Sequence, residues 1–370
     1  TRWIMFLALR DLRVARGRFV LVGVVIGLVA LLTTVLSGLA NGLVDDGISG
    51  LRALPLTHLA LQDGAESSFS RSTLTDKNLD PWKELAAKSG GDVAVSPLGV
   101  SFFNAKRANG DTIDIALFGV EPGTFLTPRS DAQAALNGTP GLVLSHEFES
   151  EGVKVGDQLT IVGVDTTLPV LGFTYAGSYG HVDIAFSSLA TWQSLVYGDN
   201  ARGRFSAIAV RTEGDASFAA VDKAAGTEVE TKEASYAGSP GFSAESATMT
   251  LIRGFLLVIS ALIVGAFFTV WTIQRTRQIG LLKALGASNG YVVRDALGQL
   301  AIVLVTAVLV GAAIALGVGA LVPEEVPFSL EASPIVTSVL ALVLLGMAGS
   351  LVAVRRITSV DPIVALSSEN

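Results

Sequence analysis

The sequence lacks the residues of most catalytic and metal-binding sites. It has no cysteine, which excludes disulfide bonds, thiol nucleophiles and cysteine-bound metals. Its three histidines, His58, His146 and His181, match no HExxH or HxH spacing, so neither a zinc enzyme nor a resident metal is expected. No glycine-rich phosphate loop and no basic cluster with interleaved aromatic residues occurs. The chain is therefore expected to bind no nucleic acid, to have no nucleotide-binding motif and not to be an enzyme.

Charged residues are also scarce. They make up 16% of the chain, against about a quarter in an ordinary soluble domain. Hydrophobic residues reach 50%, and the mean hydropathy is positive. This composition is typical of an integral membrane protein that also has a substantial water-exposed part.

Four apolar runs are long enough to cross a bilayer, because a hydrocarbon core of about 30 Å needs a helix of about 20 residues. They occupy residues 19–40, 249–273, 296–322 and 332–354. Each contains Gly, Ser or Thr, which helices in lipid use for close contact and hydrogen bonds. The sequence therefore predicts four transmembrane α-helices.

The basic residues indicate the orientation, since arginine and lysine near span ends stay on the cytoplasmic side. They lie before the first run, within 274–295 and just after the fourth run. The short loop 323–331 has three glutamates and no basic residue. We therefore expect both termini, the tail 355–370 and the 274–295 segment to be cytoplasmic. The loop 323–331 and the long segment 41–248 are then extracellular, in a multi-pass protein of the cell membrane.

Residues 1–18 combine apolar residues at helical spacing with arginines, the pattern of an amphipathic helix on the cytoplasmic membrane surface. The apolar run that follows could instead belong to a cleaved signal peptide. That run is longer than a signal-peptide core, and no clear A-x-A cleavage site follows it. An uncleaved first span is the favoured interpretation.

The segment 41–248 is far longer than an ordinary loop and must fold as a domain. Residues 111–120, 153–174 and 204–212 alternate apolar and polar residues in the manner of strands. Helices are expected at 81–88, 189–195 and 216–225. The prediction is a mixed α+β extracellular domain inserted between the first and second spans. The carboxylates that follow His146 are best explained as a solvated turn.

The segment that begins at Gln274, QRTRQIGLLKALGASNGYVVRDAL, resembles the cytoplasmic segment of the MacB/FtsX-type permeases of ABC transporters. The ending 355–370, RRITSVDPIVALSSEN, resembles the C-terminal ending of that family, and 155–161, VGDQLTI, resembles an element of its extracellular domain. One departure is Gln278, where a glutamate is usual. The resemblance extends to the arrangement of the whole chain, with four spans and a large domain between the first two.

The resemblance implies a permease subunit of an ATP-driven efflux pump, in which a homodimer works with two copies of an ATPase that binds ATP and Mg²⁺. Within the family, residues 240–288 most resemble the HrtB-type haem-exporting permeases of Gram-positive bacteria, which pair with an HrtA-type ATPase. The expected function is export of haem, captured laterally from membrane lipid at the homodimer interface. The alternatives are MacB-like export of another amphiphile (drug, peptide, lipid or lipoprotein) and mechanotransmission to an extracellular cell-wall hydrolase.

The 274–295 segment is expected to dock the ATPase through an apolar face formed by residues at three-residue spacing. The residues assigned to this coupling are Ile279, Leu282, Lys283, Leu285 and Gly286. Gly286 suits the position just after a helix end, and Ser288 or Asn289 can cap the next helix. The alternative is a helical hairpin that lies against the bilayer without a partner.

Haem is a flat apolar macrocycle with two carboxylates and an iron, so its site needs apolar walls, a cation and an iron ligand. Near the ends of the first two spans, the candidate residues are Asp45, Asp46, Phe242, Glu245, Met249 and Arg253. In the extracellular domain they are Tyr175, Tyr179 and His181, within the stretch FTYAGSYGH. Ordinary packing or surface exposure is the alternative for each of them, and the set near the spans is favoured over His58 and His146.

Overall fold

The computed structural model describes residues 16–128, 136–201, 203–214, 217–274, 276–323, 326–330 and 332–358. The chain divides into two compact units. The helical unit is drawn from Thr1–Leu43 and Ala247–Asn370, and the sheet unit is Val44–Ser246. The helix predicted over 1–18 and the tail predicted over 355–370 lie outside the described residues, apart from 16–18 and 355–358.

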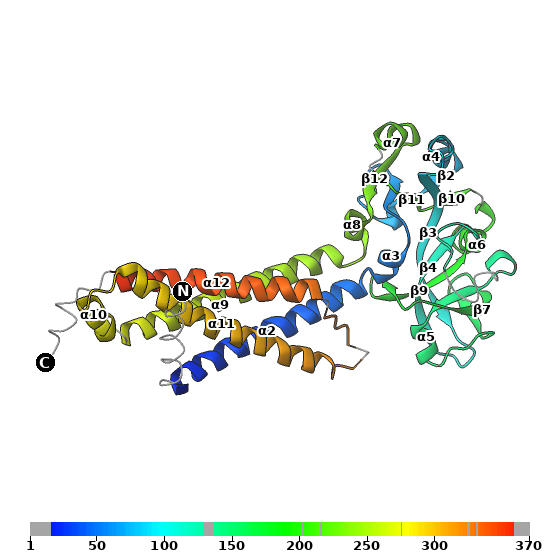
Figure 1. The fold of residues 1–370 in the computed structure, drawn as a ribbon. Helices are drawn as coiled ribbons and strands as arrows, with labels where there is room; N and C mark the ends of the chain where they lie inside the picture. Colours follow the sequence, from blue (N-terminus) through cyan, green and yellow to red (C-terminus); the bar gives the residue numbers. More distant parts are fainter. Residues whose placement is uncertain are drawn as a thin grey trace. The chain divides into compact units, whose positions relative to one another are not determined.

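The helical unit is built from long apolar helices that share one core. Its helices are α2 (Arg16–Asp46), α9 (Phe242–Gln274), α10 (Thr276–Ala284), α11 (Asn289–Gly319) and α12 (Ala332–Thr358). Figure 1 shows α2, α9, α11 and α12 side by side. Buried apolar side chains from all four meet in a common cluster that includes Ala30, Phe268, Leu304 and Leu342.

Three helices of the described residues are long and apolar enough to cross a membrane. They are Phe19–Asp46, Phe242–Trp271 and Asn289–Gly319, and they overlap the first three predicted spans, with ends that differ by up to seven residues. The fourth predicted span is also helical, within α12, but its described apolar segment is the shorter Ile335–Gly349. Passage of α12 across the membrane therefore remains a prediction.

Glycines allow these helices to approach closely. A Cβ atom added at Gly311 of α11 would lie 2.3 Å from the carbonyl oxygen of Gly27 on α2. A Cβ atom added at Gly349 of α12 would lie 2.5 Å from the carbonyl oxygen of Ala261 on α9. Helix pairs in lipid gain from van der Waals contact rather than from the hydrophobic effect, so small residues at crossing points are expected.

The sheet unit is organised around a ten-stranded sheet, with the strand order β12-β1-β11-β3-β4-β9-β5-β7-β6 and β8 paired with β9. Its strands are β1 (His58–Gln62), β3 (Val93–Lys106), β4 (Thr112–Val120), β5 (Leu142–Ser145), β6 (Gln158–Ile161), β7 (Thr166–Thr174), β8 (Ser178–Tyr179), β9 (Val182–Ser188), β11 (Ala207–Thr212) and β12 (Thr227–Thr231). Two further short strands, β2 (Leu74–Thr75) and β10 (Arg204–Phe205), pair with each other. Strand β6 also pairs with β3. The strands β3, β4, β9, β5, β7 and β6, in that order, therefore form a closed ring.

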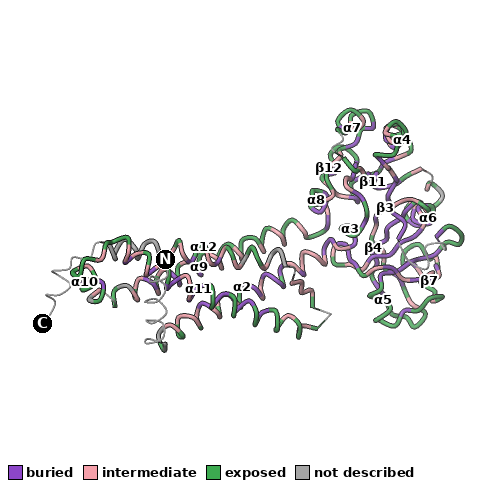
Figure 2. Tube along the Cα trace, in the orientation of Figure 1, coloured by how far each residue is buried: buried purple, intermediate pink, exposed green. Residues whose placement is uncertain are grey.

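Short helices surround this sheet (Figure 1). They are α3 (Ser49–Ala53), α4 (Asp76–Lys88), α5 (Glu147–Ser150), α6 (Leu189–Tyr197), α7 (Ala219–Ala225) and α8 (Lys232–Ser235). Two apolar clusters fill the sheet unit, one around Trp82 and Trp192 and the other around Phe118 and Tyr179. Figure 2 shows the strands as the most buried part of this unit.

The predicted α+β domain is confirmed, with strands at 111–120, 153–174 and 204–212 and helices at the three predicted places. Two helix starts differ, since α7 begins at Ala219 rather than at residue 216. The helix predicted from Pro81 begins five residues earlier, at Asp76. There, the backbone N–H of Thr75 donates to Asn78 Oδ1 at 2.9 Å, which caps the helix start.

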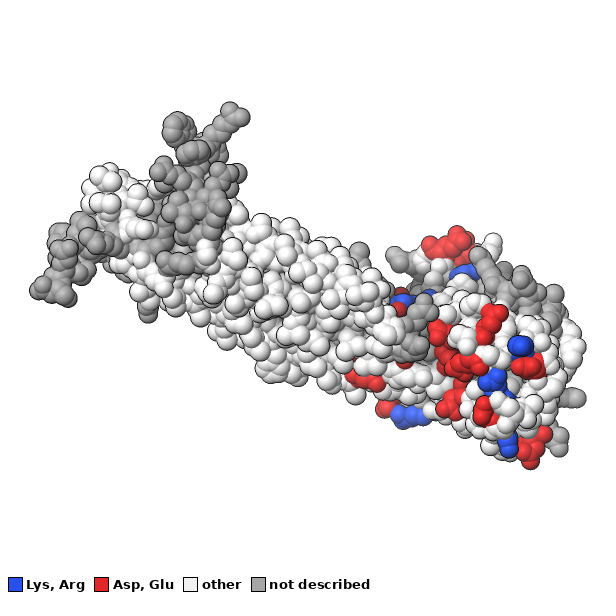
Figure 3. All heavy atoms as spheres, turned by 90° about the horizontal axis from the view of Figure 1, so that it is seen from below, with Lys and Arg blue, Asp and Glu red and all other residues white. Residues whose placement is uncertain are grey.

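Charge is distributed unevenly over the surface. On the face seen in Figure 3, the Lys, Arg, Asp and Glu side chains gather over the sheet unit, and the surface of the helical unit is almost uncharged. The exposed side chains of the helical unit include many large apolar ones, among them Leu28, Phe255, Leu262 and Leu309. A surface of this kind suits lipid rather than water.

Candidate functional site

The predicted haem-binding residues divide between the two units. Asp45, Asp46, Tyr175, Tyr179, His181, Phe242 and Glu245 belong to the sheet unit, and Met249 and Arg253 belong to the helical unit.

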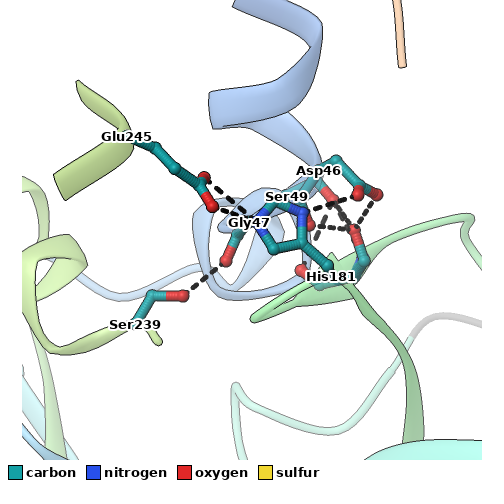
Figure 4. Close-up of polar contacts among 7 residues, drawn as sticks. Asp46, Gly47, Ser49, His181, Ser239 and Glu245 are labelled. Carbon is teal, nitrogen blue, oxygen red and sulfur yellow. Dashed lines mark hydrogen bonds and ion pairs between the residues drawn. The ribbon is translucent and has the colours of Figure 1, made fainter. Parts of the chain in front are cut away.

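In the sheet unit, His181 joins the last residue of α2 to the first turn of α9. Its Nδ1 lies 2.8 Å from Asp46 Oδ2, and its Nε2 lies 3.0 Å from Glu245 Oε2 (Figure 4). A carboxylate only accepts hydrogen bonds, so both bonds are made together only when the imidazole is protonated and donates from both nitrogens. We call these three residues the histidine bridge.

The chain around the histidine bridge is fixed by backbone geometry and small polar residues. Gly180 and His181 form the turn between β8 and β9, and both have a positive φ, of 60° and 61°. The Gly180 N–H donates to the Gly47 carbonyl at 2.9 Å, and Ser239 Oγ donates to the same carbonyl at 2.7 Å. Ser178 Oγ bonds Asp46 Oδ1 at 2.9 Å. These contacts hold the histidine between its two carboxylates.

His181 and the neighbouring Asp183 both have a shifted pKa. Burial lowers the pKa of His181, but the hydrogen bonds and negative charges of Asp46 and Glu245 outweigh it, so the pKa is raised from 6.5. Burial, with the charges of Glu147, Glu151 and Asp46, raises the pKa of Asp183 to about 7. Both shifts mean that the folded protein holds a proton that the unfolded chain releases at a lower pH.

The histidine bridge predicts a stability that falls as the pH rises. Below about pH 6.5 His181 is charged in both states, so its stabilisation is complete, and it is lost as the pH rises through the raised pKa of the folded state. The raised pKa of Asp183 also makes the stability fall as the pH rises, between about pH 4 and 7. We expect the melting temperature of the purified chain to fall across both windows. His181→Gln should flatten only the alkaline part of this dependence and Asp183→Asn only the acidic part.

A melting temperature of the His181→Gln variant that still falls above about pH 7 with the wild-type slope would contradict the ion-pair role of His181. Asp183→Asn serves as the matched control, because it removes a neighbouring titratable group of β9 and leaves the bridge in place.

The two tyrosines lie inside the sheet unit. Tyr179 is 2% exposed and packs among Phe69, Phe102 and Phe118. The Tyr175 hydroxyl donates to the carbonyl of Gly50 at 3.3 Å. Burial raises the pKa of both phenols. The sequence stretch 173–181 therefore supplies core residues and one bridging histidine.

The remaining two candidates of the sheet unit also have partners. Arg52 donates to Asp45 Oδ2 at 2.7 Å, and Phe242 packs edge-to-face on Tyr236 with ring centroids 6.1 Å apart. Among the described residues, no group of three or more His, Cys, Asp or Glu side chains is arranged to hold a metal ion.

In the helical unit, Arg253 of α9 faces a polar stripe on α2. Its guanidinium donates to Asn41 Oδ1 and, at 3.4 Å, to the carbonyl oxygen of Ser37. Ser37 and Thr33 lie one and two turns before Asn41, respectively, and both are 2% exposed. We call Thr33, Ser37, Asn41 and Arg253 the arginine seam. Of these, Arg253 is a predicted site residue and Thr33 and Ser37 are not, although polar residues four apart in an apolar run indicate one helix face.

The predicted coupling residues do not share one face. Ile279 is 5% exposed and packs in the core of the helical unit, whereas Leu285 is 78% exposed and Leu282 is 37% exposed. A step of three residues falls about 60° short of a helical turn, so Ile279 and Leu285 point about 120° apart. The exposed apolar surface here comprises Leu281, Leu282 and Leu285. Leu281 is not among the predicted coupling residues.

The turn between α10 and α11 has the predicted chemistry. Gly286 has a φ of +94°. The Ala287 N–H donates to the Leu282 carbonyl, and the Gly286 N–H donates to the Lys283 carbonyl, both at 3.0 Å. This is the pattern of a Schellman motif, in which glycine adopts the left-handed conformation after a helix end.

Ser288 then caps α11, since its hydroxyl accepts the Tyr291 N–H at 3.3 Å. The letters of residues 286–290 match G-x-S-x-G, the motif of a nucleophile elbow between a strand and a helix. Here the serine lies between two helices and serves as an N-cap, so the match is one of letters alone.

Comparison with known proteins gives matches over the whole chain. The model of the MacB-like periplasmic core domain matches residues 19–227, and that of the FtsX-like permease C-terminal domain matches residues 250–362. The chain is 23% identical over 362 residues to a protein of Staphylococcus haemolyticus named as hemin transport system permease HrtB, covering 98% of this chain and 99% of that protein.

Two further similarities are to a second permease over nearly its full length and to a solved structure of a periplasmic region. The chain is 24% identical over 367 residues to a protein of Mycobacterium tuberculosis named as an ABC transporter permease, with 98% of this chain and 99% of that protein covered. The crystal structure of the periplasmic region of MacB from Actinobacillus actinomycetemcomitans is 12% identical and covers 50% of this chain and 92% of its own, with a TM-score of 0.36.

Proposed function

Since the chain belongs to the MacB/FtsX-type family of ABC transporter permeases, we propose that it is the permease subunit of an ATP-driven pump that exports haem. The observation that carries this proposal is the similarity, over nearly the full length of both chains, to permeases named for hemin transport. The family assignment itself accounts for membrane-spanning helices, an extracellular domain and an ATPase partner.

Lateral capture from the membrane is the entry route that suits this cargo. Haem partitions into lipid because its macrocycle is apolar, so it reaches a permease from within the bilayer rather than from water. The helical unit presents large apolar side chains at its surface, among them Phe255 and Leu262 of α9. We propose that two copies of the chain enclose the cargo between their first and second spans, and that two HrtA-like ATPase subunits drive its release.

Met249 and Glu245 are the proposed iron ligands near the start of α9. A methionine thioether is a known ligand of haem iron, and carboxylates bind iron in non-haem sites. Met249 is half-buried in the helical unit. The Glu245 carboxylate is bonded to His181, so its use as a ligand requires that the histidine bridge opens.

A haem titration tests the proposed function. The permease, purified with its ATPase in lipid nanodiscs, should shift the Soret band of added haem and should hydrolyse ATP faster when haem is present. Met249→Leu and Glu245→Gln should each alter the bound spectrum if that residue ligates iron. Iron-free protoporphyrin is the matched control, because it keeps the macrocycle and the carboxylates but cannot be ligated. No Soret shift and no stimulation of the ATPase by haem would exclude haem as cargo and favour another amphiphile.

A further inference from the structure

The arginine seam contains buried polar atoms that no described residue satisfies. Thr33 Oγ1, Ser37 Oγ and Arg253 Nε are buried and have no hydrogen-bond partner among the described residues. A polar group removed from water without a partner costs free energy, and the cost is larger for a charged group. Three such atoms on one seam are therefore evidence for a bound group that forms hydrogen bonds with them.

The hydroxyls of the arginine seam differ from other hydroxyls in the helical unit. Thr34 donates to the carbonyl four residues before it at 2.8 Å, and Ser260 and Thr306 do the same at 2.6 and 2.7 Å. This is the usual way in which a helix in lipid satisfies a hydroxyl. Thr33 and Ser37 make no such bond within the described part of the chain. Their hydrogen-bonding capacity is therefore unused among the described residues.

The charge of the seam is also uncompensated. Arg253 forms no ion pair with a carboxylate among the described residues; its guanidinium donates only to the neutral Asn41 side chain and the Ser37 carbonyl. Asp45, one turn beyond Asn41 on α2, is bound to Arg52 of the sheet unit. An arginine within an apolar helix marks a functional site by default, because its burial is costly unless a counter-charge arrives.

We propose that the arginine seam binds one oxyanion, a carboxylate or phosphate group carried by an amphiphile. Arg253 supplies the charge and a free N–H, Ser37 and Thr33 supply hydroxyl donors, and Asn41 holds the guanidinium in place. A planar guanidinium matches the two oxygens of a carboxylate or phosphate. The favoured source is a carboxylate of the exported cargo, an assignment that rests on the proposed haem function. A lipid phosphate has the same chemistry and is the other source.

The first arm of the test uses the wild-type complex in nanodiscs and compares haem with haem dimethyl ester, which keeps the iron and loses both carboxylates. We expect the ester to bind at least about tenfold more weakly, the effect of losing one charge-assisted hydrogen bond. Arg253→Gln and the pair Thr33→Val/Ser37→Ala should weaken haem binding by a similar factor and leave ester binding unchanged. Thr34→Val is the matched control, because that hydroxyl is already satisfied by Ala30.

The second arm measures retained lipid by native mass spectrometry. If haem and its ester bind equally, and Arg253→Gln loses a tightly held anionic phospholipid that Thr34→Val retains, the oxyanion is a lipid phosphate. The proposal is overturned if the ester binds like haem and all variants keep their lipid. A wild-type complex that binds no haem would refute the proposed cargo alone. The lipid measurement would then test whether the arginine seam binds an oxyanion.

Discussion

Replacing Leu285 with glutamate is expected to reduce export to below about a tenth of the wild-type rate while the permease remains folded and in the membrane. Leu285 is 78% exposed at the end of α10, so a charge there costs the isolated permease little. Against a docked ATPase the same carboxylate would be buried without a partner, which costs several kcal/mol, and each 1.4 kcal/mol weakens association about tenfold. Co-purification of the ATPase with the permease and efflux from loaded vesicles measure the effect.

Two variants separate docking from folding. Leu285→Met keeps an apolar side chain of similar volume, and the complex and its export activity should survive. Ile279→Glu places a charge in the core of the helical unit, since Ile279 is 5% exposed, and should lower the yield of folded protein. Export by Leu285→Glu at the wild-type rate would show that this surface does not dock the ATPase.

Replacing Gly311 with alanine is expected to destabilise the helical unit by about 1–3 kcal/mol, the usual cost of overpacking. The added Cβ atom would lie 2.3 Å from the Gly27 carbonyl oxygen, and a backbone oxygen cannot move without moving α2. The displaced pair α2 and α11 would lose contact along its length. Thermal unfolding of the full chain in detergent measures the change.

The same helix offers a matched control for this variant. A Cβ atom at Gly317 would meet nothing within 4 Å, and alanine favours a helix over glycine by about 1 kcal/mol. Gly317→Ala should therefore be neutral or slightly stabilising. If Gly311→Ala behaved like Gly317→Ala, the close approach of α2 and α11 at Gly27 would be wrong.

Features that depend on neighbouring residues were accessible from the sequence. The first three spans could be predicted because crossing a bilayer requires only a sufficient length of apolar helix. The turn at Gly286 could be predicted because a helix end that needs a left-handed residue selects glycine. Both follow from local chemistry, so no knowledge of the tertiary fold was needed.

Features that depend on distant residues were not accessible. His181 is 135 residues from Asp46 and 64 residues from Glu245, and only the folded sheet unit brings them together. All three were selected as separate candidates, and none was predicted to bind another. The face of α10 was predicted wrongly for Ile279 because spacing alone does not say which side of a helix its neighbours cover.

The closed ring of strands also bears on how two copies of the chain can associate. Because β6 returns to β3, the long strands of the ring leave few unpaired backbone groups at which another chain could add a strand. In the main strand order of the described residues, β12 ends the sheet, with β1 as its one neighbour, and it carries Glu228 and Glu230. Two such edges would bring like charges together, a common natural defence against aggregation by strand addition. In the proposed homodimer, we therefore expect the contacts between the two copies to come from the helices rather than from added strands of the extracellular domain.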